Sequence, residues 1–290
     1  MDLALSRAAV PRLEFVASTG STNDDLRAAA TGPEAAAWPH GSVIVTDDQT
    51  RGRGRMGRTW LAPTGKTLAI SVLLRPELPG GRPFPTEAYG WIPLMAGAAM
   101  TEAVRRAVDA AASARHDSDE EDGSGGVDVV LKWPNDVLVS DYKICGILSE
   151  LLPPSAGGGT PSAAPAVVVG AGLNLTLDEH DLPTLTSTSL LLVTGMRPDA
   201  DAVLADYLSG FLGLVRSFAE HGGDPEASGI ATRVAALCGT LGSDVRVQLP
   251  GDRELLGVAE RIDRDGRLVV RDRNGEAQAV AAGDVTHLRY

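Results

Sequence analysis

The C-terminal tail constrains the fold of this chain more than any other stretch. From residue 243 onward, short segments that alternate apolar and polar residues are separated by turn signals, of which Asp265–Gly266 and Asn274–Gly275 are strong hairpin dipeptides. Alternation with a period of two is typical of strands that bury one face. We therefore predict that residues 239–290 form a small β-barrel-like domain, which at this size needs to pack against a neighbour, residues 1–238.

Residues 1–238 mix strand and helix patterns, with a strand–turn–helix unit over residues 14–30. Further strands are predicted over residues 42–47, 67–75, 128–132, 136–140, 144–152 and 166–175, and helices over residues 88–112, 199–221 and 225–238. Residues 50–58 are predicted to form a loop. The acidic stretch 115–126 and the Gly/Pro-rich stretch 153–165 are interpreted as solvated surface insertions.

Composition and charge exclude several classes of function. The formal net charge of −12 argues against binding of nucleic acid or anionic membranes through the overall field. The longest apolar run, residues 89–104, contains Pro93 and Glu102, and no signal pattern precedes it, so a cytoplasmic protein is expected. Cys145 and Cys238 stand far apart and the five histidines are scattered, so nothing requires a disulfide or a metal centre.

The segment Gly52–Arg58 (GRGRMGR) is the sharpest local motif. Its glycines match the G-x-G-x-x-G dinucleotide fingerprint, but that fingerprint opens a helix, whereas Pro63 and then a strand follow here. Gly65–Thr67 (GKT) fails as a P-loop, because the required earlier glycine is replaced by Trp60. The sequence therefore supports neither of the two common nucleotide-binding motifs.

Alternating glycine and arginine suit a segment that closes over a small anion. Glycines let the backbone approach a ligand closely, and arginines supply permanent charge with forked donors for phosphate or carboxylate. Arg51, Arg53, Arg55 and Arg58 gather here in an otherwise acidic chain. The alternative, an ordinary solvated basic loop, is less favoured because of this concentration.

Two further constellations carry polar chemistry at predicted strand ends. Lys132 and Asn135–Asp136 lie in KWPND, and Lys143 opens the apolar run KICGIL. Asp136 is a candidate ligand for a divalent metal on a nucleotide, and Lys143 either extends outward to solvent or meets an anion in a pocket. The glycines of Gly170–Asn174 (GAGLN) mark either close approach by a ligand or a β-bulge, and the sequence leaves both open.

Taken together, these constellations supply cations for an acid and a phosphate, glycines for close contact and one carboxylate for Mg²⁺. That set suits the attack of a carboxylate on the α-phosphate of ATP, in which both reactants are anions whose repulsion must be screened. The residues themselves point to adenylation of an acid without naming the acid.

The same blocks resemble the biotin protein ligase family. They are Ser21–Asn23, Gln49 with GRGRMGR, KWPNDV with KICGIL, and GAGLNL, in the family's order and spacing. The resemblance implies an α+β fold, a mixed β-sheet backed by helices and related to class II aminoacyl-tRNA synthetases, with a small SH3-like C-terminal domain. It implies formation of biotinyl-adenylate from biotin and Mg-ATP, then transfer to a lysine of a biotin carboxyl carrier domain of acyl-CoA carboxylases.

The resemblance also assigns roles to individual residues. The biotin site would comprise Ser21, Thr22, Asn23, Gln49, Gly52, Arg53, Arg55, Lys143, Gly146, Gly170 and Gly172. The ATP site would comprise Arg55, Arg58, Trp60, Lys132, Asn135, Asp136 and Asn174, with Asp136 next to Mg²⁺. Lys143, Arg55 and Arg53 would carry the catalysis. A plain core tryptophan remains an equal alternative for Trp60.

Three rival functions follow from the same pattern. A ligase that also represses transcription needs a DNA-binding module, which residues 1–13 are too short to supply, so a monofunctional enzyme is expected. A lipoate ligase or octanoyl transferase would share the architecture, but the GRGRMGR segment favours biotin. A non-catalytic biotin- or nucleotide-binding protein is disfavoured because Lys143, Arg55 and Asp136 are all present.

Overall fold

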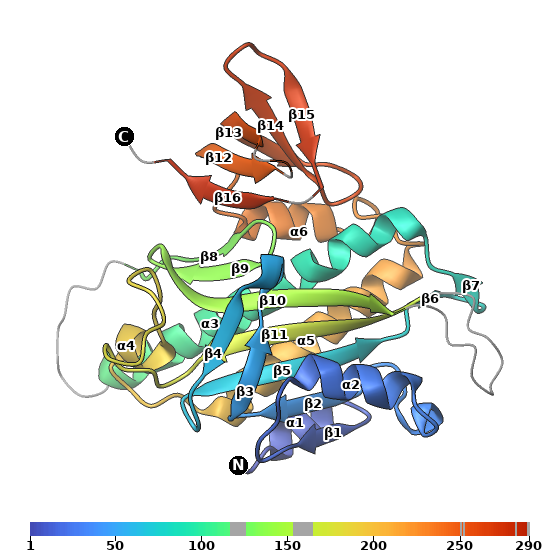
Figure 1. Cartoon of the computed structure of the whole chain (residues 1–290), viewed down its shortest axis with the longest axis vertical. Coiled ribbons are helices and arrows are strands. Elements are labelled where there is room, and N and C mark those ends of the chain that lie inside the picture. Colours follow the sequence, from blue (N-terminus) through green and yellow to red (C-terminus); the bar gives the residue numbers. More distant parts are fainter. Residues whose placement is uncertain (117–125, 153–164, 250, 252, 282, 289–290) are drawn as a thin grey trace.

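A seven-stranded mixed sheet forms the centre of the molecule in the computed structural model, which describes all residues except 117–125, 153–164, 250, 252, 282 and 289–290 (Figure 1). In spatial order the strands are β1 (Leu13–Phe15), β2 (Val43–Thr46), β5 (Thr67–Leu74), β11 (Ala166–Asn174), β10 (Tyr142–Leu152), β9 (Asp136–Val139) and β8 (Val129–Lys132). Only β1 and β2 pair in parallel; the other neighbours are antiparallel. The predicted mixed sheet is confirmed.

Helices cover this sheet on both faces. Two long helices, α3 (Ile92–His116) and α5 (Ala200–Glu220), pack behind it, while α2 (Thr22–Thr31) lies across its front face near β5 and β11 (Figure 1). Shorter helices are α1 (Ala4–Ala9), α4 (Leu190–Thr194) and α6 (Ile230–Leu237), and short 3-10 turns span Ala35–Ala37 and Thr86–Trp91. Helix α6 begins later than the predicted start at residue 225, because residues 224–228 form turns closed by the Asp224 carboxylate.

The residue alternation of β11 separates the two faces of the sheet. Val167, Val169, Ala171 and Leu173 join the main hydrophobic core under α3 and α5. The residues between them face the front, where Val168 packs in the smaller cluster around Leu26 of α2 and two glycines, 170 and 172, follow. The front face is therefore apolar at one end of the strand and nearly bare of side chains at the other.

The predicted loop over residues 50–58 is instead part of a β-hairpin. Strands β3 (Gln49–Arg53) and β4 (Thr59–Ala62) are antiparallel and are joined by a 3-10 turn, Arg55–Gly57, in front of the sheet (Figure 1). Gly52 pairs with Trp60 and Arg53 with Thr59, and the Gly54 amide donates to the Arg58 carbonyl at 2.7 Å. The glycines were interpreted as letting the backbone approach a ligand closely; in the structure Gly52 permits close cross-strand packing against Trp60. We call residues 49–62 the flap hairpin.

The C-terminal tail forms a separate five-stranded antiparallel sheet, as predicted. Its strands, in spatial order, are β15 (Ala277–Val280), β14 (Leu268–Asp272), β13 (Arg253–Ile262), β12 (Asp244–Leu249) and β16 (Asp284–His287). Two tryptophans fix it to the larger domain: Trp91 Nε1 donates to the Arg264 carbonyl at 2.7 Å, and Trp133 Nε1 donates to the Gly266 carbonyl at 3.1 Å. The Asp265–Gly266 turn, predicted as a hairpin signal, thus also serves as a docking point.

The remaining sequence predictions have mixed outcomes. Among the described helices, α5 is long and apolar enough to span a membrane, whereas the sequence pointed to residues 89–104 as the longest apolar run. The Tyr207, Phe211 and Phe218 side chains of α5 are fully buried in the core, as expected of the central helix of a globular domain. Cys145 and Cys238 are both free and buried. Most of the two predicted insertions, 115–126 and 153–165, lies outside the described residues.

Candidate active site

A cavity of about 680 Å³ opens between the front of the sheet, the flap hairpin and the C-terminal strand β16. It is lined by every residue predicted for the biotin and ATP sites except Gly52 and Asn174. Segments far apart in the sequence, from Ser21 to His287, meet in this one space. A single large concave site with convergent polar groups is the usual form of a small-molecule binding site.

Small residues form the floor of this cavity. A Cβ added at Gly172 would overlap the Trp60 ring, and one added at Gly146 would stand 3.1 Å from Lys143 Nζ and 3.3 Å from Trp60 Cζ3. The glycines therefore make room for the indole of the flap hairpin. Trp60 walls the cavity, and its Nε1 is buried without a hydrogen-bond partner among the described residues.

The two cations on which the adenylation hypothesis depends share this cavity. Lys143 Nζ lies 2.7 Å from Asp136 Oδ1 and 5.9 Å from the centroid of the Trp60 ring. Arg55 reaches in from the flap hairpin and donates through Nη1 to Asn135 Oδ1 at 2.7 Å. Asn135 in turn donates to Asp136 Oδ1 at 3.0 Å, so one polar chain joins the flap hairpin to β9 and β10.

The local fold explains why these side chains meet. Strands β9 and β10 form a hairpin in which Asp136 pairs with Gly146, and the register shifts between Lys143 and Cys145. An extra residue at such a bulge re-aims the side chains beside it. Lys143, predicted either to reach solvent or to enter a pocket, therefore faces Asp136 inside the cavity.

Burial lowers the pKa of two cavity residues. Desolvation lowers the pKa of Lys132, and the nearby carboxylates of Asp136 and Asp284 oppose that effect. Desolvation also lowers the pKa of Arg55, and the Asp136 carboxylate again acts in the opposite direction. Both side chains are cations held in a partly dehydrated space, so an incoming anion would recover interaction energy that water no longer provides.

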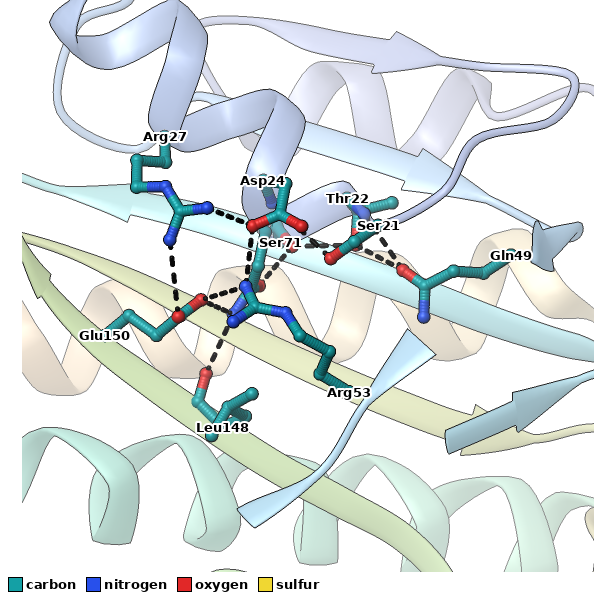
Figure 2. A network of polar contacts seen from close by, with 10 residues as sticks. Ser21, Thr22, Asp24, Arg27, Gln49, Arg53, Ser71, Leu148 and Glu150 are labelled. Atoms are coloured by element: carbon teal, nitrogen blue, oxygen red, sulfur yellow. Dashed lines mark hydrogen bonds and ion pairs between the residues drawn. The ribbon is translucent and has the colours of Figure 1, made fainter. Parts of the chain in front are cut away.

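A polar cluster closes the opposite end of the cavity, at the start of α2 (Figure 2). Ser21 caps the helix by accepting from the Asp24 amide, and the Thr22 amide donates to Gln49 Oε1 at 2.9 Å. Ser71 Oγ lies 2.8 Å from Thr22 Oγ1 on the front face of β5. These neutral donors and acceptors are held in place by hydrogen bonds to one another and to the start of α2.

Asn23 and Arg53 have their side chains engaged within the protein. Asn23 Nδ2 donates to Glu150 Oε2 at 2.8 Å, and its Oδ1 accepts from Ser71 Oγ at 2.6 Å. Arg53 Nη2 donates to Asp24 Oδ1 at 2.7 Å and to Glu150 Oε2 at 3.1 Å (Figure 2). Gly170 is required by this cluster, because an added Cβ would overlap Asn23.

Two predicted site residues lie behind the cavity wall. Asn174 is buried and donates to the Thr188 carbonyl at 2.8 Å, and the Thr188 amide donates to the Lys143 carbonyl at 2.9 Å. Asn174 thus supports the segment that flanks Lys143. Gly52 faces Gln49 and the backbone of Trp60 across the hairpin, where a side chain would not fit.

Some cavity residues were not predicted from the sequence. Asp284 of the C-terminal sheet lines the cavity and forms an ion pair with Arg58, and the loop 183–187 lines the side next to Lys143. A lone aspartate in a β-strand and a polar loop carry no motif, so only the long-range packing reveals them. Glu150, which lies outside the cavity lining but pairs with Arg53 at its edge, was also not predicted, although it follows KICGIL on the same strand.

The magnesium prediction can be tested against the residues present. Among the described residues, no group of three or more His, Cys, Asp or Glu side chains could hold a metal ion. Asp136 is one carboxylate in the cavity, and Mg²⁺ bound with ATP takes one or two carboxylates besides phosphates and water. The residues therefore fit a magnesium ion that arrives with the nucleotide.

Comparison with known proteins matches both domains. The model of the "Biotin/lipoate A/B protein ligase family" matches residues 16–174, and that of the "Biotin protein ligase C terminal domain" matches residues 240–288. The biotin--[acetyl-CoA-carboxylase] ligase of Mycobacterium tuberculosis is 35% identical over 96% of this chain and 90% of its own length. The bifunctional ligase/repressor BirA of Escherichia coli is 27% identical over 85% of this chain and 66% of its own length.

The fold also matches solved structures. The biotin protein ligase from Aquifex aeolicus, in complex with biotin and ATP, superposes with a TM-score of 0.68 over 97% of this chain and all of that chain, at 23% sequence identity. At that identity the likeness establishes the fold alone.

Proposed function

This chain belongs to the biotin/lipoate A/B protein ligase family, and we propose that it is a biotin protein ligase that forms biotinyl-5′-AMP and transfers biotin to a carrier-domain lysine. The observation that carries this proposal is the convergence of Arg55 and Lys143 on one cavity with a glycine floor. Residues 1–238 would hold both substrates, and residues 239–290 would line the nucleotide side, where Asp284 pairs with Arg58.

The polar and apolar parts of the cavity fit the two ends of biotin. The ring system would lie against the Trp60 indole, which itself packs on Gly146 and Gly172, with its ureido group at the Ser21, Thr22 and Gln49 end. Its carboxylate would point toward Lys143. The ATP phosphates would lie by Lys132, Arg55 and Arg58, with Asn135 and Asp136 next to them.

The chemistry of the first step requires mainly charge and position. A biotin carboxylate oxygen attacks the α-phosphorus of ATP, a P–O bond forms, and pyrophosphate leaves. Lys143 and Arg55 would screen the repulsion between these anions and stabilise the charge on the transferring phosphorus. Mg²⁺, when bound with ATP, neutralises charge on the phosphates. As the substrates arrive, Lys143 would leave its partner Asp136 and pair with a substrate anion instead.

The second step needs an acceptor amine rather than a protein nucleophile. The uncharged amine of the carrier lysine attacks the carbonyl carbon of the mixed anhydride, and a C–N bond forms. The bond from that carbon to the bridging oxygen breaks, AMP leaves with this oxygen on its phosphate, and the nitrogen releases one proton to solvent. The flap hairpin would exclude water from the adenylate in the interval. The partners are therefore biotin, ATP and a biotin carboxyl carrier domain of an acyl-CoA carboxylase, and we place the reaction in the cytoplasm.

One incubation tests the proposal. The protein is mixed with biotin, Mg-ATP and a purified biotin carboxyl carrier domain, and the intact mass of the carrier is measured. We expect the mass to rise by one biotinyl group, only when ATP is present. Parallel incubations supply lipoate or octanoate with a lipoyl carrier domain. Modification in those reactions and none with biotin would assign the chain to the other branch of its family.

A further inference from the structure

Four charged side chains form a closed ring at the edge of the cavity (Figure 2). Asp24 and Arg27 come from α2, Arg53 comes from the flap hairpin, and Glu150 comes from β10. The two arginines alternate with the two carboxylates, so the ring carries no net charge. It joins three elements that are otherwise separate in the sequence.

The Arg53 guanidinium is committed to this ring. One nitrogen, Nη2, contacts Asp24 Oδ1 at 2.7 Å and Glu150 Oε2 at 3.1 Å. An arginine neutralised by two carboxylates attracts a biotin carboxylate or a phosphate weakly. Arg55, two residues further along, reaches Asn135 on the opposite side of the flap hairpin. The two arginines of the motif thus have different surroundings.

Glu150 is held by Asn23 as well as by the two arginines of the ring. Its Oε2 accepts from Asn23 Nδ2 at 2.8 Å, and Asn23 fills the space over Gly170 while accepting from Ser71. The Glu150 side chain is 20% exposed, whereas the Asp24 and Arg53 side chains are 44% and 41% exposed. Glu150 is not part of the cavity lining, so it is the fixed point of the ring and does not reach a ligand.

We propose that Glu150 is a positioning residue that anchors Arg53, and through it the flap hairpin, against β10 and α2. This inference rests on the proposed ligase function. Anchoring Arg53 places Arg55 over Asn135 and Trp60 over Gly172, so the flap hairpin covers the cavity in one register. Arg53 then acts through the position of the flap hairpin rather than by direct contact with an anion.

A competing interpretation makes the opposite prediction. If Glu150 only masks Arg53 until an anionic substrate displaces it, removal of the Glu150 charge frees the guanidinium and tightens biotin or ATP binding. If Glu150 anchors the flap hairpin, the same change loosens the cover of the cavity and weakens biotin binding. The sign of the change in the KM for biotin therefore separates the two.

The test compares Glu150→Gln with Glu102→Gln. Glu102 is a matched control, because its side chain is 19% exposed and pairs through both oxygens with Arg233, on the helical side of the sheet. For Glu150→Gln we expect the KM for biotin to rise about two- to fivefold with little change in kcat, and trypsin to cut after Arg55 and Arg58 several-fold faster. Glu102→Gln should leave both measurements unchanged.

A double-mutant cycle shows whether Glu150 acts through Arg53. In an Arg53→Gln background, Glu150→Gln should add nothing further to the KM or to the rate of cleavage after Arg55, because the anchored partner is gone. Glu150→Asp, which keeps the charge, should recover part of the protection. A lower KM for biotin, additive effects or unchanged cleavage in Glu150→Gln would each overturn the proposal.

The tryptic cleavage rate is measured without biotin or ATP and does not depend on ligase activity. A wild-type protein that fails to biotinylate the carrier would refute the ligase function while the tryptic comparison still decides the anchoring role. A melting temperature for each variant, measured in parallel, identifies any general loss of folding, and Asp24→Asn then provides a second, more exposed site on the same ring.

Discussion

The two faces of the seven-stranded sheet carry different kinds of residue, although the same strands form both. On the back face, β11 presents Val167, Val169, Ala171 and Leu173 to α3 and α5, and all four are buried in the main core. On the front face the same strand presents Gly170 and Gly172 to Asn23 and Trp60. The back face fills the core with apolar side chains, whereas the front face leaves space that groups from other elements occupy.

That difference separates stability from function along a single strand. Filling the back face with larger or smaller side chains changes packing density and therefore the free energy of unfolding. Changing the front face alters which group stands over the glycine floor and how near it comes. Neighbouring residues should consequently give opposite results when substituted.

The largest effect is expected at Lys143 on the front face. Lys143→Ala should reduce adenylate formation about 10²- to 10³-fold, because a charge that stabilises the transferring phosphate in a partly dehydrated cavity is removed. The melting temperature should change little. Pyrophosphate release measures the rate, and Lys66→Ala serves as the control, since Lys66 pairs with Asp178 and Asp181 outside the cavity lining. Wild-type turnover in Lys143→Ala would remove this residue from its role.

The next prediction compares adjacent residues of β11. Leu173→Ala should destabilise the fold by about 2–5 kcal/mol, because Leu173 is fully buried under the helices and the deletion leaves a cavity. Its KM for biotin, measured below the melting transition, should be normal. Denaturant unfolding and steady-state kinetics give the two quantities.

Gly172→Ala should show the reverse. The added methyl group overlaps the Trp60 ring, so the flap hairpin cannot lie on the floor as before, and the KM for biotin should rise about tenfold with a stability change of about 1 kcal/mol or less. Equal losses of stability in the Gly172 and Leu173 variants would contradict the functional separation of the two faces.

The sequence was sufficient to predict the main strands and helices and the motifs of the front face. Helix and strand periods arise from local geometry, so α5, β5, β11 and the hairpins of the tail could be placed within a few residues. The convergence of Arg55 and Lys143 was predicted through the family resemblance, because each motif alone was compatible with an ordinary loop or strand end.

What the sequence could not give depends on long-range packing. Glu150 lies on the front face only because β10 keeps its alternation beyond the bulge at Lys143, and its partners come from α2 and the flap hairpin. Asp284 reaches the cavity because Trp91 and Trp133 dock the tail in one orientation. Gly170 was assigned to ligand approach, yet it also accommodates Asn23, a contact with no local signature.

A smaller effect, on pH dependence, is expected at Lys132. Burial lowers the pKa of Lys132, so its ammonium loses the proton at a pH below the ordinary lysine value of 10.5. As the pH rises through that lowered pKa, attraction for ATP phosphates is lost and kcat/KM for ATP should fall. In Lys132→Arg, where the charge persists, the alkaline fall should move to higher pH. An unchanged profile would exclude Lys132 from phosphate binding.

The same shift has a consequence for stability with its own sign. Between the lowered pKa of Lys132 and 10.5, the unfolded chain binds more protons at this group than the folded chain does. The contribution of Lys132 therefore makes the fold more stable as the pH rises through that window, opposite to its effect on ATP binding. Lys132→Met should remove this pH dependence and raise the melting temperature slightly at neutral pH.

The smallest effect is expected where the flap hairpin meets the C-terminal sheet. Arg58 and Asp284 form an ion pair whose side chains are 62% and 41% exposed, and pairs this open contribute about 1 kcal/mol or less. Asp284→Asn should leave the melting temperature nearly unchanged, because the tryptophan hydrogen bonds hold the two domains together. It should lower the KM for ATP about twofold, since Arg58 is freed for phosphate, and high salt should abolish the difference. Two melting transitions for Asp284→Asn in a thermal scan, or a raised KM for ATP, would contradict this prediction. The Arg58–Asp284 pair would then stabilise the contact between the flap hairpin and the C-terminal sheet.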